Sequence, residues 1–180
     1  LAADIGPGLA KAALAVKVDG EVRDLAREIA HDARVEIVTR DHENALELLR
    51  HDAAHVMAEA VKELYPDTQV TIGPAIEDGF YYDFEVDEPF TPEELERIEE
   101  EMRRVAEAGD AFERRVVTAE EARALFADDP LKLERLAEFD ADEVITVYRN
   151  GPFVDLCRGP HVPGTGEVKH FKLLSPAGAD

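Results

Sequence analysis

A helical repeat of apolar residues across residues 41–64 constrains the fold more than any other feature of the sequence. Apolar side chains recur every three or four positions, which predicts one long amphipathic helix. Asp41 is a candidate N-cap, and Tyr65-Pro66-Asp67 predicts the end of the helix. The rest of the chain is therefore expected to pack along the apolar stripe, which consists of Leu46, Leu49, Ala53, Val56, Met57, Ala60 and Leu64.

Two histidines, His51 and His55, lie on the other side of this predicted helix. A step of about 100° per residue places both roughly 180° from the centre of the stripe. The same step places Leu48, Glu59 and Lys62 beside them. The histidines are thus not expected to face the core that this helix makes. Taken alone, two histidines at this spacing are typical of a solvated helix face.

The single cysteine, Cys157, precedes His161 by four positions, with Gly159-Pro160 between them. One cysteine excludes an internal disulfide, so the thiol is either a small buried group or a chemically active one. Arg158 and His161 are expected to lower the thiol pKa. If this loop docks over the histidines of the helix, three imidazoles and a thiol converge. Such a set can hold zinc or order a nucleophilic water, and the spacing does not decide between the two.

The remaining pattern predicts an α+β fold in which one antiparallel sheet carries the loop with the cysteine. Asp78-Gly79 predicts a hairpin between residues 70–76 and 80–86. Capping boxes at Thr91 and Thr118 each predict the start of a helix. A short helix is expected at 130–137, and further strands are expected at 112–117, 144–148, 153–157 and 168–174.

The first 40 residues predict a separate, small β-rich unit. Its expected strands are residues 14–18, 21–25 and 35–38, with a turn at Asp19-Gly20. Residues 5–8 read as a break, and an alanine-rich turn follows. The predicted division is therefore a domain at 1–40, truncated at its start, and a second domain at 41–180.

The charge of the chain limits the partners that it attracts. It has 41 acidic and 20 basic residues and a formal charge of -21 at pH 7. Such a surface repels polyphosphates, so nucleic-acid binding by this chain alone is expected to be weak. No apolar run approaches the ~20 residues that span a bilayer, and the start does not resemble a signal peptide. The expectation is an intracellular protein with no membrane partner.

Several segments resemble threonyl-tRNA synthetases. The sequence Asp155-Leu156-Cys157-Arg158-Gly159-Pro160-His161-Val162-Pro163 resembles part of the editing domain of that family. Residues 51–60 resemble its His-x-x-x-His helix, and residues 72–84 its hairpin rich in glycine and tyrosine. Residues 1–40 resemble most of a TGS domain. Alanyl-tRNA synthetase relatives share the two pairs of ligands but not the Cys-Arg-Gly-Pro-His context.

The resemblance implies a function and a set of roles. The implied activity is that of an aminoacyl-tRNA deacylase, which hydrolyses the ester of mischarged Ser-tRNA(Thr) at the tRNA 3′ end. The water would be ordered by His51, His55, Cys157 and His161. Lys132 would lie near the attacked carbonyl, and Asp155 would hold the serine amine. The nucleotide pocket would be shaped by Gly73, Pro74 and Tyr82.

The resemblance also implies cytoplasmic location and, for the full-length protein, a homodimer formed through domains absent here. ATP would serve only the aminoacylation core, which this chain lacks. No metal is expected for editing; if zinc binds, its ligands would be His51, His55, Cys157 and His161. Two alternatives stay open, a zinc-dependent hydrolase of another aminoacyl ester and a non-catalytic tRNA-binding module.

Overall fold

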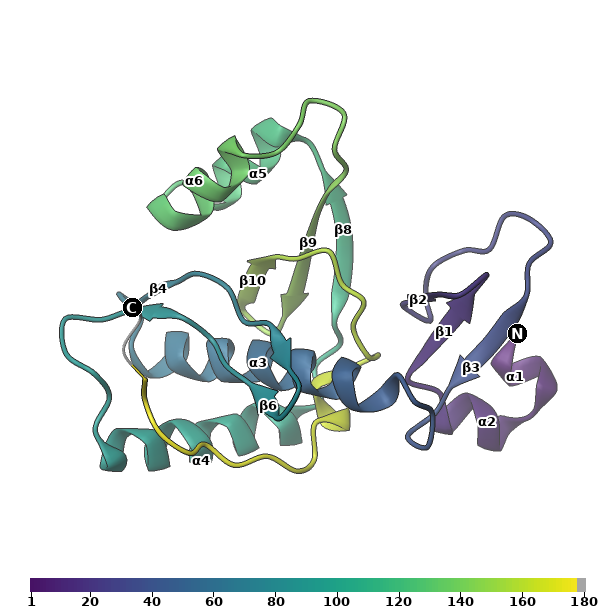
Figure 1. The fold of residues 1–180 in the computed structure, drawn as a ribbon, viewed down its shortest axis with the longest axis horizontal. Helices are drawn as coiled ribbons and strands as arrows, with labels where there is room; N and C mark the ends of the chain where they lie inside the picture. Colours follow the sequence, from purple (N-terminus) through teal and green to yellow (C-terminus); the bar gives the residue numbers. More distant parts are fainter. Residues whose placement is uncertain (178–180) are drawn as a thin grey trace.

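The computed structural model describes residues 1–177 and confirms an α+β fold. Within that range the strands form four small antiparallel sheets around the long helix α3 (Ala45–Leu64). Helix α4 (Pro92–Ala108) runs along one side of α3, and the sheet of β8, β9 and β10 lies on the other (Figure 1). The N-terminal unit lies beyond the first turns of α3. Among the described residues, none of the helices combines the length and the hydropathy that crossing a bilayer requires.

Helices α3 and α4 build the main core between them. Val56 and Val61 of α3 and Met102 of α4 are fully buried in one apolar cluster. The predicted N-cap at Asp41 is wrong: α3 begins at Ala45, because residues 39–45 first form turns in which backbone N–H groups bond to carbonyls three residues back. Leu46, expected in the apolar stripe, is 58% exposed.

Local capping chemistry sets the starts of three helices. Thr91 and Thr118 both form the predicted capping boxes, at α4 and at α5 (Ala119–Leu125). Helix α6 (Pro130–Ala137) has the predicted bounds, and the Asp129 side chain caps it by accepting from the Lys132 N–H. Helices α5 and α6 cover one face of the sheet formed by β8 (Glu113–Val117), β9 (Ile145–Asn150) and β10 (Phe153–Leu156).

The N-terminal unit is a three-stranded antiparallel sheet with two short helices. Its strand order is β2 (Glu21–Arg23), β1 (Ala15–Val18), β3 (Val35–Val38). The predicted turn at Asp19-Gly20 is present, with positive φ at both residues. Helices α1 (Ala2–Ile5) and α2 (Pro7–Ala12) replace the predicted break and turn. In α2, proline occupies the first turn, and the following alanines and leucine favour a helix.

The predicted hairpin around Asp78 is present but divided into two short ladders. Strand β4 (Gln69–Val70) pairs with β7 (Phe84–Glu85), and β5 (Ala75–Ile76) pairs with β6 (Gly79–Phe80). The strands are shorter than predicted because Gly73-Pro74 interrupts them, and proline has no N–H to donate to a ladder. The turn residues are Glu77 and Asp78, one position earlier than expected.

The predicted strand at 168–174 is wrong. This segment follows a short 3-10 helix, η1 (Thr165–Glu167), and runs beside α4 without pairing to a strand. The Leu173 N–H donates to Glu99 Oε2 of α4 at 3.0 Å, so a side chain and not a neighbouring strand accepts this backbone hydrogen bond. Glu99 is consequently buried, although it is one of many acidic residues on α4.

Candidate active site

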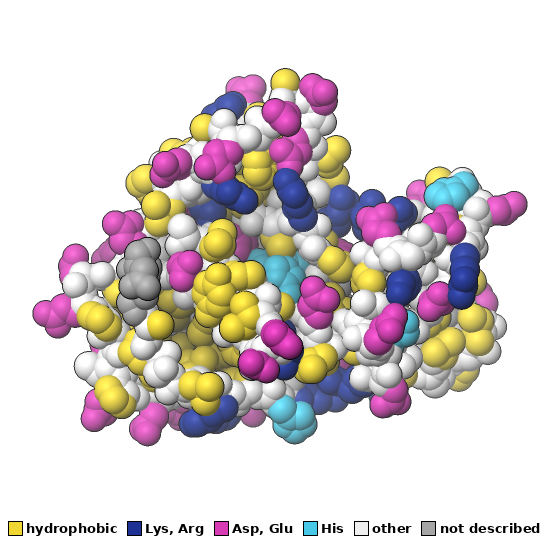
Figure 2. All heavy atoms as spheres, in the orientation of Figure 1, with side chains coloured by type: hydrophobic (Ala, Val, Ile, Leu, Met, Phe, Trp, Pro, Cys, Tyr) yellow, Lys and Arg dark blue, Asp and Glu magenta, His cyan; other side chains and the backbone are white. Residues whose placement is uncertain are grey.

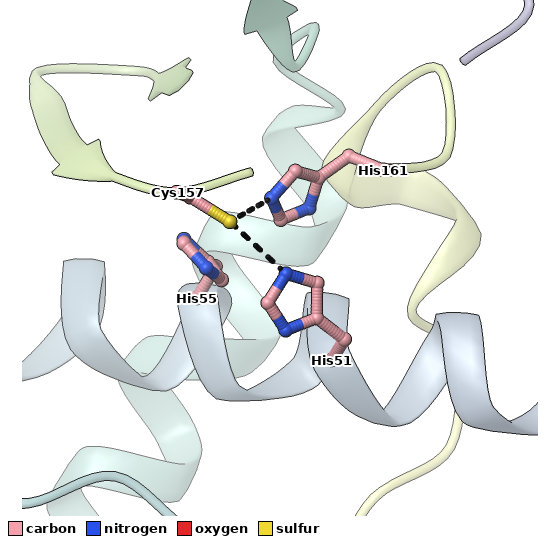
Figure 3. A group of neighbouring side chains, drawn as sticks. All are labelled: His51, His55, Cys157 and His161. Carbon is pink, nitrogen blue, oxygen red and sulfur yellow. Dashed lines mark hydrogen bonds between the residues drawn. The ribbon is translucent and has the colours of Figure 1, made fainter. Parts of the chain in front are cut away.

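The structure brings the two pairs of candidate ligands together. The Cys157 Sγ lies 3.2 Å from His51 Nε2 and 3.3 Å from His161 Nε2. One ligand atom from each of His51, His55, Cys157 and His161 lies within 4.8 Å of all the others. Figure 3 shows the two histidines of α3 below the loop that carries Cys157 and His161. Three imidazoles and one thiol thus face a common point.

The face of α3 that carries the histidines is covered, not solvated. His55 is 2% exposed, with its ring centroid 6.4 Å from that of Tyr82 and 6.3 Å from that of Phe153. The prediction that the histidines would not face a core is therefore wrong for His55, because β10 and the hairpin pack over this side of the helix. Burial, followed by the effect of His161, lowers the pKa of His55 well below its usual value.

Asp52 orients His161 from behind. Its Oδ1 lies 2.5 Å from His161 Nδ1, and its Oδ2 accepts the Val162 N–H at 3.2 Å. Burial raises the pKa of Asp52 to about 8 and lowers the pKa of His161 well below its usual value. This contact engages Nδ1 and leaves Nε2 directed at Cys157. No local pattern distinguishes Asp52 from the many other acidic residues of the chain.

The prediction of a lowered thiol pKa is wrong. Burial, reinforced by the charge of Asp155, raises the pKa of Cys157 to about 12. Arg158 has no part in it, because its guanidinium pairs with Glu143 instead. The Gly159 N–H donates to Sγ at 3.3 Å, which favours the thiolate but does not outweigh burial. At neutral pH the group is a neutral thiol.

Lys132 and Asp155 form a second polar group beside the first. The Lys132 Nζ lies 2.5 Å from Asp155 Oδ1 and donates to the Thr71 carbonyl at 2.5 Å. The Tyr82 hydroxyl donates to Asp155 Oδ2 at 2.7 Å. Burial opposes ionisation of Asp155, but Lys132 and then His55 hold its pKa below the usual value. Asp155 is therefore an ionised carboxylate inside the site.

A cavity of about 400 Å³ opens beside these groups. In Figure 2, histidine atoms are visible at the bottom of a hollow, next to apolar atoms. Gly73 and Pro74 line the cavity, whereas Tyr82 lies behind Gly73, where any Cβ would overlap the tyrosine ring. His161 also lies behind the wall. The other sequence-predicted site residues that line it are His51, His55, Lys132, Asp155 and Cys157.

The N-terminal unit contributes a residue that sequence reasoning missed. Asp24, just after β2, accepts two hydrogen bonds, one from the Tyr148 hydroxyl at 2.6 Å and one from the His161 backbone N–H at 2.9 Å. Gly159 passes so close to the Tyr148 hydroxyl that a Cβ there would overlap it. Asp24 and Tyr148 therefore hold the loop that places Cys157 and His161.

Two family models match parts of the chain. Residues 1–39 match the TGS domain, and residues 145–178 match the threonyl and alanyl tRNA synthetase second additional domain. The threonine--tRNA ligase of Pelobacter propionicus is 56% identical to this chain over 181 residues, and that of Rhodospirillum rubrum is 57% identical over 182 residues. The chain corresponds to the N-terminal region of threonyl-tRNA synthetases. These alignments cover 99% of this chain and 28% of each relative.

The synthetase similarity extends over both halves of the site. The second additional domain model starts at the first residue of β9 and includes Cys157 and His161, but not α3. The alignment to the threonine--tRNA ligase of Granulibacter bethesdensis, 56% identical over 182 residues, covers 99% of the chain and thus α3 as well. The chain spans less than a third of the length of these curated relatives.

Proposed function

We propose that this chain is an editing module, which hydrolyses the ester of serine on tRNA(Thr). The observation that carries the proposal is the convergence of His51, His55, Cys157 and His161 beside a cavity that also holds an ionised Asp155. The similarity to threonine--tRNA ligases supplies the substrate class. The reaction would take place in the cytoplasm, where tRNA is charged, and the full-length protein would act as a homodimer.

The need for such a reaction follows from the chemistry of the two amino acids. Serine lacks one methyl group of threonine, and a missing methyl is worth about 1–3 kcal/mol of discrimination. A site that accepts threonine therefore admits some serine, and synthetases in general correct such errors with a second, hydrolytic site. In this proposal the cavity wall excludes the threonine methyl and admits the serine side chain.

A water molecule attacks the ester carbonyl, and the carbon–oxygen bond to the ribose breaks. His51 and His55 lie at the cavity wall and order that water, and the proton that the water loses passes to the departing ribose oxygen. Asp155 binds the serine ammonium group through its remaining lone pairs. The third N–H of Lys132 Nζ donates to the Tyr82 hydroxyl at 3.4 Å, the longest of its three hydrogen bonds, and it turns to the oxyanion when substrate is bound.

Cys157 acts here as a hydrogen-bonding group and not as a nucleophile. Only a thiolate attacks carbonyls efficiently, and a pKa of about 12 keeps the thiol protonated at neutral pH. The thiol links His51 to His161, and Asp52 fixes His161 in turn. No covalent acyl-enzyme is needed.

A zinc-dependent hydrolase is the second candidate, because the same four residues fit a metal. Three imidazoles and one thiol are ligands that tetrahedral zinc accepts, and an acidic side chain hydrogen-bonded to a ligating histidine, as Asp52 is to His161, is typical of zinc sites. Bound zinc would lower the pKa of a coordinated water. We propose that editing proceeds without it. Deacylation that persists in excess chelator supports this choice, whereas loss of activity restored by zinc would overturn it.

Release of serine from Ser-tRNA(Thr) tests the proposal, with Thr-tRNA(Thr) as the control substrate. The assay compares the chain with a double variant, His51→Ala with Cys157→Ala, at high protein concentration and moderate ionic strength, because salt screens the repulsion between the charge of -21 and RNA. We expect hydrolysis of the seryl ester alone and its loss in the variant. Binding of tRNA without turnover would identify a binding module, and equal hydrolysis of both esters would exclude editing.

A further inference from the structure

A second cavity, of about 550 Å³, lies next to the active-site cavity. His51, Pro74 and Gly159 line both cavities, so the two share a wall and lie side by side. Nothing in the proposed mechanism uses the second one. It is formed where β2 of the N-terminal unit, the first turns of α3 and the hairpin meet the loop at residues 159–160.

The two cavities are suited to successive units of one chain. The substrate of the proposed reaction is the end of an RNA strand, and one phosphodiester joins its last two nucleotides. When the terminal nucleoside and its amino acid fill the first cavity, the next nucleotide must lie at the edge of that cavity. The wall at His51, Pro74 and Gly159 is such an edge, and beyond it lies the second cavity.

The lining of the second cavity suits a base and not a phosphate. Val22, Leu48 and Pro160 offer apolar surface of the kind on which the faces of a planar base pack. Glu47 also lines the cavity, and its carboxylate repels a phosphate. The environment therefore favours the base of the next nucleotide, with its phosphate held away from Glu47.

Two acceptors in this cavity call for a donor from the ligand. Asn44 lines the cavity, and its Oδ1 is buried without a hydrogen-bond partner among residues 1–177, which is costly; a turn of this side chain into the cavity would let a ligand satisfy the oxygen. The Glu47 carboxylate is the second acceptor. An exocyclic amine carries two hydrogens and satisfies both, and cytosine presents its N4 amine in this way to acidic side chains. Uracil has a carbonyl at that position. All tRNAs end in C-C-A, so the base before the terminal adenosine is a cytosine.

We propose that the second cavity binds the cytosine of the penultimate nucleotide of tRNA, whose N4 amine donates to Asn44 and Glu47. The inference rests on the proposed function, because it assumes an aminoacylated RNA end in the first cavity. It adds a subsite to that function, and it gives Val22 of the N-terminal unit a part in substrate binding.

Three minimal substrates test the subsite: the seryl ester of adenosine, of the dinucleotide CpA and of the dinucleotide UpA. The dinucleotides carry the same phosphate, so their comparison removes the effect of charge. We expect the CpA ester to have a kcat/KM about tenfold above that of the UpA ester, mainly through KM, since a good base contact contributes a factor of that order. Equal values for CpA and UpA would overturn the subsite while the proposed function stands. No hydrolysis of any of the esters, or of Ser-tRNA(Thr), would overturn both.

Variants of the chain locate the effect. Glu47→Ala is expected to bring the ratio of kcat/KM for the CpA ester to kcat/KM for the UpA ester close to one. An unchanged ratio would contradict the proposal. Glu43→Ala is the matched control, because it removes the same charge near the start of α3 from a side chain that pairs with Lys17 at 3.4 Å and does not line the cavity. Val22→Phe fills the cavity and is expected to lower kcat/KM for the CpA ester to that for the adenosine ester.

Discussion

The two sides of α3 are both buried, but different interactions hold them. On the side toward α4, Val56 and Val61 pack against apolar residues such as Met102. On the other side, Asp52, His55 and Glu59 are each at most 2% exposed. There Asp52 contacts His161, and Glu59 accepts the Asn150 amide at 2.6 Å. The difference shows that a polar helix face becomes part of an interior when another element supplies partners for it.

The apolar side should show the largest loss of stability on truncation. Met102→Ala removes a fully buried side chain between the two helices and leaves a cavity. We expect the free energy of unfolding in urea to fall by about 2–5 kcal/mol. Leu46→Ala is the control, because Leu46 is 58% exposed on α3 and should change the value by less than about 0.5 kcal/mol. Similar losses in both variants would contradict the packing described for α3.

On the polar side, loss of a partner should matter more than loss of volume. Asp52→Ala leaves the Val162 N–H and the His161 Nδ1 without their partner, and we expect a loss of about 1–3 kcal/mol of unfolding free energy. Asp52→Asn retains an oxygen that accepts the Val162 N–H and should cost less. Equal destabilisation by alanine and asparagine would mean that the hydrogen bonds do not hold this face.

Stability on the polar side should also depend on pH, through Glu59. Burial, opposed by Asn150 and reinforced by Glu63, raises the pKa of Glu59 from 4.5 to about 7. A raised pKa in the folded state means that this residue contributes stability below about pH 4.5, which is lost as the pH rises through about 7. Glu59→Gln removes the titration.

Unfolding measured at pH 5 and pH 8 checks this. The free energy of unfolding of the unmodified chain should fall by about 2–3 kcal/mol more over that range than that of the Glu59→Gln variant. Asp52 titrates in both proteins, so the difference isolates Glu59. A larger fall in the variant would reverse the sign and refute the prediction.

The parts of the fold that could be predicted are those that local chemistry decides. Thr91 and Thr118 begin helices because the capping groups lie three residues apart in the sequence. No comparable local pattern shows whether an extended apolar segment will pair with another strand. Residues 168–174 have the pattern of a strand, yet their backbone bonds to Glu99 of α4, a contact that depends on tertiary packing.

The candidate site divides in the same way. His51, His55, Cys157 and His161 could be selected because histidine and cysteine are scarce in this chain. Asp24 and Asp52 could not, because they are two among 41 acidic residues and only the folded chain shows their contacts. The direction of the Cys157 pKa shift was missed for a related reason. Neighbours in sequence suggested a thiolate, but burial is set by the whole fold.

The contact of Asp24 with Tyr148 and His161 bears on how such proteins can be cut and recombined. The sequence suggests a seam near residue 40, where one module stops and another starts. A chain trimmed at that seam would lose a wall of the second cavity and the acceptor for the His161 N–H together. Exchange of N-terminal units between homologues should therefore succeed only when the donor brings an aspartate at the position of Asp24. The boundary between the two modules in the sequence is thus not a boundary of the candidate site.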